Sequence, residues 1–63
     1  MEYVVSELIE AKVSLISLIQ KSEKALPKLK VGSGAHTYLL RRIKAFHLSL
    51  ALIEEKLLQN DGH

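Results

Sequence analysis

The sequence predicts an all-α protein, an antiparallel hairpin of two long helices. Apolar residues recur every three or four positions in two long segments, which is the spacing of a helix face. Between these segments lies PKLKVGSGAH, which holds the only proline and two of the three glycines of the chain. A chain of 63 residues forms one domain at most. We therefore expect a single helical-hairpin domain over residues 1–63.

The first helix is expected from about residue 3 to residue 26. Two apolar seams run side by side along it. One consists of Val4, Leu8, Ala11, Leu15 and Leu18, and the other of Val5, Ile9, Ile16 and Ile19. Lys12 occupies the empty position of the second seam. We expect its stem to lie on apolar surface while its ammonium meets water or a glutamate; a buried lysine that sets the helix register is the alternative. Pro27 disfavours helical geometry at Leu26 and has no amide hydrogen, so it ends the helix.

The second helix is expected from about residue 37 to residue 59, after a loop over residues 27–36. Thr37 is a better N-cap than His36, because its hydroxyl accepts a hydrogen bond from a free amide. The main apolar seam consists of Leu39, Ile43, Phe46, Leu50, Ile53 and Leu57, and a shorter seam of Ala45, Leu48 and Leu52. Residues 60–63 have no apolar anchor, so we expect this tail to fray.

Two seams on each helix predict two partners for each helix, because one helix contact needs only a narrow apolar stripe. The hairpin supplies one partner. The chain has no cysteine for disulfides, so a second chain is the remaining way to complete so small a core. We expect a homodimer in the form of a four-helix bundle, with Ile9, Ile16, Ile19, Leu48 and Leu52 at the interface. A monomeric hairpin with an exposed apolar face and a complex with a different protein are the alternatives.

The charges are separated along the predicted hairpin. The half near the loop carries seven cations and one glutamate, a net charge of +6, and the open half carries six acids and two lysines, a net charge of −4. Three interpretations remain. Arg41 and Arg42 orient two hairpins head to tail; or the loop end binds an anion such as nucleic-acid phosphate; or it is a solvated surface without a role. The basic cluster of the second interpretation consists of Lys28, Lys30, Arg41, Arg42 and Lys44.

No motif indicates catalysis, a metal or a cofactor. The stretch VGSGAHT has no strand before it and no Gly-Lys-Ser/Thr after it, as a phosphate-binding loop requires. His36, His47 and His63 are too scattered for a set of metal ligands. Glu54 and Glu55 point about 100° apart on a helix, so they cannot act as paired carboxylates. We expect no enzymatic activity, no cofactor and no metal.

Location and function follow from these patterns as expectations. No apolar run is long enough to span a membrane, and the N-terminus begins acidic rather than basic and then apolar, so a cytoplasmic protein is expected. The expected role is a non-enzymatic small protein-interaction or regulatory module that acts as a homo-oligomeric helical bundle. The alternative is a small nucleic-acid-associated regulator that uses the basic loop end.

Overall fold

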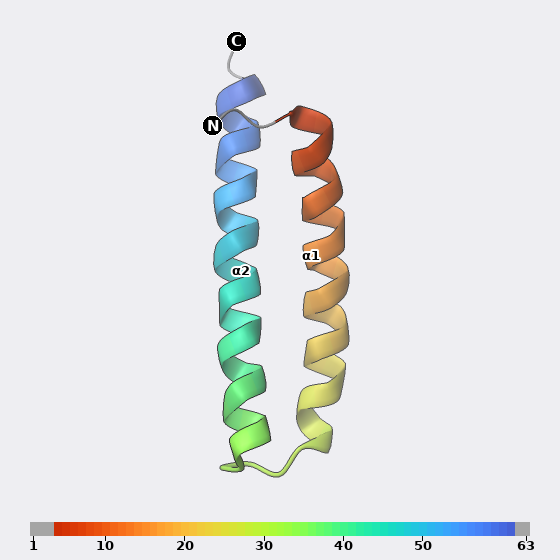
Figure 1. Ribbon diagram of the computed structural model, residues 1–63, viewed down its shortest axis with the longest axis vertical. Helices are drawn as coiled ribbons and strands as arrows, with labels where there is room; N and C mark the ends of the chain where they lie inside the picture. Colours follow the sequence, from red (N-terminus) through yellow and green to blue (C-terminus); the bar gives the residue numbers. More distant parts are fainter. Residues whose placement is uncertain (1–3, 62–63) are drawn as a thin grey trace.

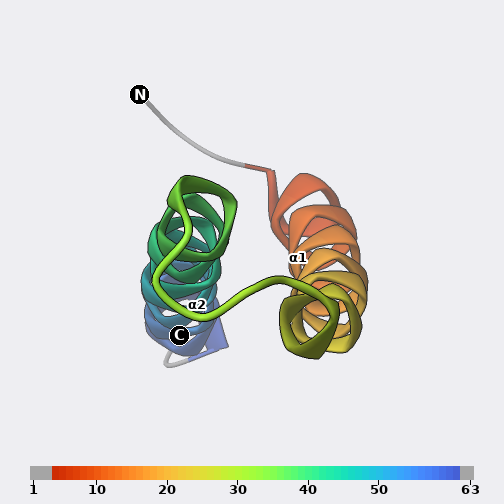
Figure 2. The same cartoon turned by 90° about the horizontal axis from the view of Figure 1, so that it is seen from below.

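The computed structural model describes the backbone of residues 4–61 and the side chains of residues 4–59. Helix α1 (Val5–Ala25) is followed by a short 3₁₀ turn, η1 (Leu26–Lys28), and by helix α2 (Gly34–Asp61), which runs antiparallel to α1 (Figure 1). The hairpin measures 47 × 17 × 15 Å. The all-α class and the two helices are therefore confirmed. Seen from the loop end, α1 and α2 form a single layer, so both broad sides of the hairpin are open (Figure 2).

The first helix ends where the proline predicts. Leu26 is the C-cap of α1, and its amide donates to the carbonyl of Ser22. Pro27 stands in the first turn of η1, where its missing amide hydrogen costs no hydrogen bond. At the other end α1 begins at Val5, and residue 3 of the expected helix lies outside the described residues.

The second helix begins three residues earlier than expected, at Gly34. The predicted cap at Thr37 is wrong, because Ser33 fulfils this role. The Ser33 hydroxyl accepts from the amide of His36 at 3.1 Å, and its carbonyl accepts from the amide of Thr37 at 3.1 Å. Gly32, with a φ of +86°, makes the turn that precedes the cap. The helix also continues through residues 60 and 61, which were expected to fray, and residues 62 and 63 lie outside the described part.

Each helix lays one stripe of side chains on the other. On α2 this stripe is the predicted main seam, Leu39, Ile43, Phe46, Leu50, Ile53 and Leu57, all half-buried. On α1 it combines members of both predicted seams, namely Leu8, Ala11, Lys12, Leu15 and Ile19. Leu8 and Ile19 are eleven residues apart and so differ by only about 20° around the helix. The contact line therefore runs between the two seams and buries Ile19, while Leu18 lies to one side of it and stays 40% exposed.

Candidate interaction surface

The hairpin leaves most of its apolar side chains in solvent. Leu8 and Ile19 are the only buried hydrophobic residues in the described part of the chain. The accessible surface is 5104 Å², whereas a compact globular monomer of this mass exposes about 4,100 Å². The exposed large hydrophobic residues are Val4, Val5, Ile9, Val13, Ile16, Leu18, Val31, Tyr38, Leu40, Leu48, Leu52 and Leu58. A single hairpin is too thin to cover them.

Helix geometry sorts these residues onto the two broad sides of the layer. On α1, Leu8 faces inward, and its neighbours Glu7 and Ile9 lie about 100° to opposite sides of it. On α2, Ile53 faces inward, and its neighbours Leu52 and Glu54 likewise lie about 100° to opposite sides. One side, here named the Leu52 face, carries Ala11, Leu18, Ala45 and Leu52. The other, here named the Ile9 face, carries Val5, Ile9, Ile16, Leu40 and Leu58.

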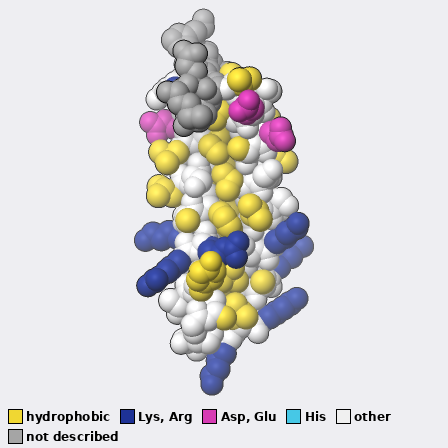
Figure 3. Space-filling model, in the orientation of Figure 1, with side chains coloured by type: hydrophobic (Ala, Val, Ile, Leu, Met, Phe, Trp, Pro, Cys, Tyr) yellow, Lys and Arg dark blue, Asp and Glu magenta, His cyan; other side chains and the backbone are white. Residues whose placement is uncertain are grey.

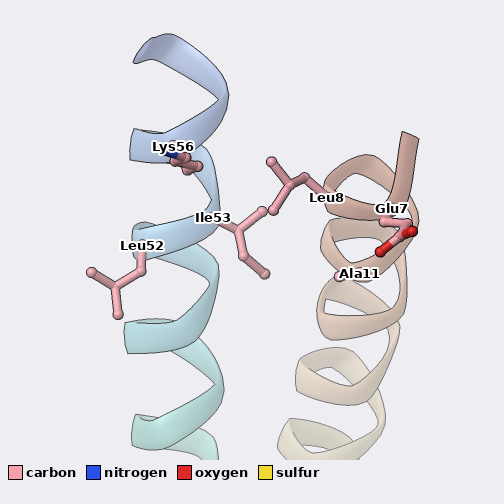
Figure 4. A pocket seen from close by; sticks show the side chains of 6 residues that line it. All are labelled: Glu7, Leu8, Ala11, Leu52, Ile53 and Lys56. Carbon is pink, nitrogen blue, oxygen red and sulfur yellow. The ribbon is translucent and has the colours of Figure 1, made fainter. Parts of the chain in front are cut away.

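A shallow apolar hollow marks each face near the open end of the hairpin. The hollow of the Leu52 face lies between α1 and α2 and is lined by Glu7, Leu8, Ala11, Leu52, Ile53 and Lys56 (Figure 4). The hollow of the Ile9 face is lined by Val5, Ile9, Lys12, Glu54, Leu57 and Leu58. Both hollows are open grooves between helices, of the kind that another helix or side chain can fill.

The five predicted interface residues do not form one patch. Ile9 is 50% exposed and Ile16 38% exposed, both on the Ile9 face. Leu52 is 59% exposed on the Leu52 face, and Leu48 is 64% exposed at the outer edge of α2 beside it. Ile19 is only 6% exposed, because it packs within the hairpin itself. Sequence periodicity alone does not assign the seams to sides, since that requires the contact line between α1 and α2.

Two contacts between acidic and basic side chains connect the helices, and both lie on the Ile9 face. The Lys12 Nζ is 3.4 Å from Glu54 Oε2, and the two side chains are 37% and 49% exposed. The expectation that the Lys12 ammonium meets a glutamate is confirmed. Nearer the loop, His47 Nε2 is 3.7 Å from Glu23 Oε2, a contact that is an ion pair only when the imidazole is protonated. Lys12 and Glu54 therefore offset each other in the open half of this face, and His47 offsets Glu23 in its protonated form.

The Leu52 face has a different charge layout. A band of hydrophobic side chains runs along the layer in Figure 3, with Lys and Arg on both flanks and over the band itself in the half near the loop, and Asp or Glu on both flanks in the half near the termini. The lengthwise charge asymmetry predicted from the sequence is therefore concentrated on this face.

The predicted basic cluster is exposed at the loop end. Lys28, Lys30, Arg41, Arg42 and Lys44 are all solvent-accessible, and no described carboxylate pairs with them. The Arg42 guanidinium lies 5.7 Å from the centre of the Tyr38 ring and 5.6 Å from that of Phe46. These contacts hold the guanidinium over two aromatic rings while leaving its hydrogen-bond donors free. The i, i+4 spacing of Tyr38, Arg42 and Phe46 is the sequence signal of this arrangement, and the apolar periodicity does not reveal it.

Other kinds of site find no support in residues 4–59. No three His, Asp or Glu side chains within this range come together as metal ligands. Neither described helix is both long enough and apolar enough to cross a membrane. Comparison with protein-family models, curated proteins and solved structures gives no match for this chain. The features that point to a function are therefore the Leu52 face, the Ile9 face and the basic cluster at the loop end.

Proposed function

We propose that the chain is a non-enzymatic protein-interaction or regulatory module that acts as a homo-oligomer, two hairpins packing into a four-helix bundle. The observation that supports it most is the exposure of large apolar side chains on a single layer of two helices. Apolar surface of this extent on a small soluble hairpin favours association, at about 25 cal/mol for each Å² that association buries. A second layer covers one broad side, as in other four-helix bundles.

Solution mass across a dilution series tests this proposal. Sedimentation equilibrium is expected to give twice the chain mass at high micromolar concentration and a falling average mass on dilution. Leu52→Glu and Ile9→Glu place a carboxylate on one face each, and both positions are exposed in the single hairpin, so the fold is retained. The variant that abolishes the dimer identifies the buried face. A folded chain that keeps the single-chain mass at high micromolar concentration contradicts the proposal.

A second candidate function is a nucleic-acid-associated regulator. The observation in its favour is the cluster of unpaired cations at the loop end, with Arg42 supported by Tyr38 and Phe46. Cations of this kind neutralise phosphates, so binding weakens steeply as salt rises. Fluorescence anisotropy with a labelled DNA duplex and an RNA hairpin, repeated over a salt series, measures this.

Arg41→Glu separates the two functions. If the substitution leaves the dimer intact but abolishes salt-sensitive binding of the labelled nucleic acid, the second candidate gains. If it weakens the dimer, self-association gains. Lys56→Glu serves as a matched control for binding, since it makes the same change of charge at an exposed position in the open half of the chain that takes part in no described ion pair, away from the basic cluster.

A further inference from the structure

We propose that a second copy of this chain docks on the Leu52 face with its long axis reversed, so that the loop end of each hairpin lies beside the open end of the other. This inference rests on the proposed self-association, and it adds the face and the orientation. The second copy is chosen as the occupant because two lines of charge along this face complement those of the same face turned end for end; Lys56, which lines the hollow of this face, is outside these lines.

The complementarity follows from two sets of exposed residues spaced seven apart. Positions seven apart lie within about 20° of one another on a helix, so each set forms a line along its helix. On α1 the set is Glu7, Ser14 and Lys21, and on α2 it is Arg41, Leu48 and Glu55. Each set has a charge at one end, an uncharged residue in the middle and the opposite charge at the other end. When a second copy is turned end for end about the middle residue, the charge at each end of the line lies against the opposite charge of the other copy.

The middles of the two sets lie at nearly the same height of the hairpin. Ala11 and Leu52 line the same hollow, so they lie at similar heights. Three residues toward the loop on each helix, Ser14 lies at a height similar to that of Ser49, the neighbour of Leu48. One two-fold axis across the Leu52 face at this height thus reverses both sets together. An isologous dimer has this symmetry.

The contacts of this dimer follow from the axis. Glu7 meets Lys21 of the second copy where the two α1 helices face each other. At the outer edge of α2, Arg41 meets Glu55 of the second copy; each pair occurs twice by symmetry. None of these four residues pairs with a charge inside its own hairpin in the described structure. The flanks in Figure 3 show the same reversal, with basic side chains in one half and acidic side chains in the other.

An apolar band fills the space between these pairs. Ala11, Leu18, Ala45 and Leu52 form it, and its small members let two layers approach closely. Helix α1 has 21 residues and spans about 32 Å. With the 17 Å width of the hairpin, each copy offers about 500 Å² in projection, near the lower end of specific interfaces once both copies are counted.

The opposite orientation, with both loops at one end, is disfavoured by charge. It places α1 of one copy against α2 of the other at equal heights, and Lys21 then lies beside Arg42 of the second copy. It also brings together two loop ends that are both strongly basic. Like charges placed against each other suppress an arrangement more than matched pairs strengthen one.

Charge reversal tests the orientation. Lys21→Glu is expected to raise the dissociation constant on the order of tenfold, since each dimer contains the affected contact twice. Glu7→Lys is expected to do the same, and the double variant E7K/K21E is expected to regain most of the affinity. Lys44→Glu is the matched control, because it makes the same charge change at the outer edge of α2, about 180° from inward-facing Ile53, and Lys44 takes part in none of the proposed pairs. A dimer that is strengthened by Lys21→Glu has its loops together, which overturns the proposal.

Distances between spin labels test the face. The chain has no cysteine, so single variants can be labelled without further changes. Val31→Cys, at the loop, is expected to give a distance comparable with the 47 Å length of the hairpin. Ser14→Cys, on the Leu52 face near the axis, is expected to give a much shorter distance than Gln20→Cys, on the Ile9 side of α1. A shorter distance for Gln20→Cys places the second copy on the Ile9 face and overturns the inference.

These results separate this inference from the proposed function. A chain that remains a monomer in the dilution series refutes the proposed self-association, and this inference falls with it. A dimer with a short Val31 distance, or with Gln20 labels closer than Ser14 labels, refutes only the face or the orientation. Circular dichroism of every variant confirms that the hairpin is still formed.

Discussion

Truncation of Leu48 to alanine is expected to have an effect that depends on protein concentration, whereas the effect of truncating Ile19 is expected to be independent of it. The sequence places both residues at a predicted interface, but Ile19 is 6% exposed in the hairpin and Leu48 is 64% exposed. Either substitution removes three carbons, each worth about 0.8 kcal/mol when fully buried. Scaled by burial, Ile19→Ala costs about 2 kcal/mol, and the cavity that it leaves raises this toward 3 kcal/mol. Leu48→Ala costs less than about 1 kcal/mol in the single hairpin.

Urea denaturation followed by far-UV circular dichroism measures these costs. At low micromolar concentration, Ile19→Ala is expected to lower the urea midpoint by about 2 M, given a slope of about 1 kcal/mol/M for a domain of this size. Ile19→Val, which costs about 1 kcal/mol, keeps the measurement possible if the alanine variant does not fold. Leu48→Ala is expected to leave the midpoint nearly unchanged at this concentration.

Concentration is the decisive variable. At high micromolar concentration Leu48→Ala is expected to lower the midpoint more than it does on dilution, because the residue lies next to the proposed two-fold axis. The effect of Ile19→Ala is expected to be similar at both concentrations, since its contacts lie within one chain. Equal shifts for the two alanine variants in dilute solution would refute the assignment of Ile19 to the hairpin core and Leu48 to its surface.

Three further substitutions test the local structure by thermal unfolding. Gly34→Ala is expected to stabilise the hairpin by about 0.5–1 kcal/mol, because a Cβ there meets no atom within 4 Å and the position is helical. Gly32→Ala is expected to destabilise the hairpin by at least about 1 kcal/mol, since the φ of Gly32 is +86°. The opposite order of melting temperatures would contradict both predictions. Ser33→Ala is expected to cost about 1 kcal/mol as loss of the N-cap, whereas Thr37→Ala is expected to be nearly neutral; an equal loss in both variants would return the cap to residue 37. Lys12→Met is expected to change stability by less than about 1 kcal/mol and to reduce its salt dependence, because the ion pair that it removes is partly exposed; a large loss would mean that this lysine sets the helix register.

Sequence periodicity predicts where the two helices lie, but it does not predict which apolar residues lie on which broad side of the hairpin. Spacing of three and four identifies both helices, and Pro27 marks the end of the first, because these signals are local. The start of the second helix was missed because Gly34 was interpreted as a breaker, although a glycine tolerates the first turn when Ser33 caps it. The sequence places Ile19 at the dimer interface instead of the hairpin core, because the side on which a seam lies depends on the line of contact between α1 and α2. That line is set by packing of the whole hairpin and is not encoded in one helix alone.

The charges of the two helices differ in how far one chain explains them. On α1, Glu7 lies in the first turn and Lys24 in the last, so both agree with the helix dipole. On α2, Arg41 and Arg42 are the eighth and ninth residues of a helix that begins at Gly34, beyond the first turn in which the dipole acts, so the dipole does not account for them. Stacking on Tyr38 and Phe46 gives Arg42 a partner within the hairpin.

Arg41 has no such partner in its own hairpin. In the described structure it contacts neither a carboxylate nor an aromatic ring as an ion-pair or cation–π partner. A carboxylate from outside the chain supplies what is missing, and the reversed second copy brings Glu55 to this position. Because Arg41 and Glu55 are equidistant from Leu48, the same reversal satisfies both residues in both copies. Arg41 is therefore the residue whose charge reversal is most informative, since within a single hairpin its loss breaks no described ion pair or cation–π contact.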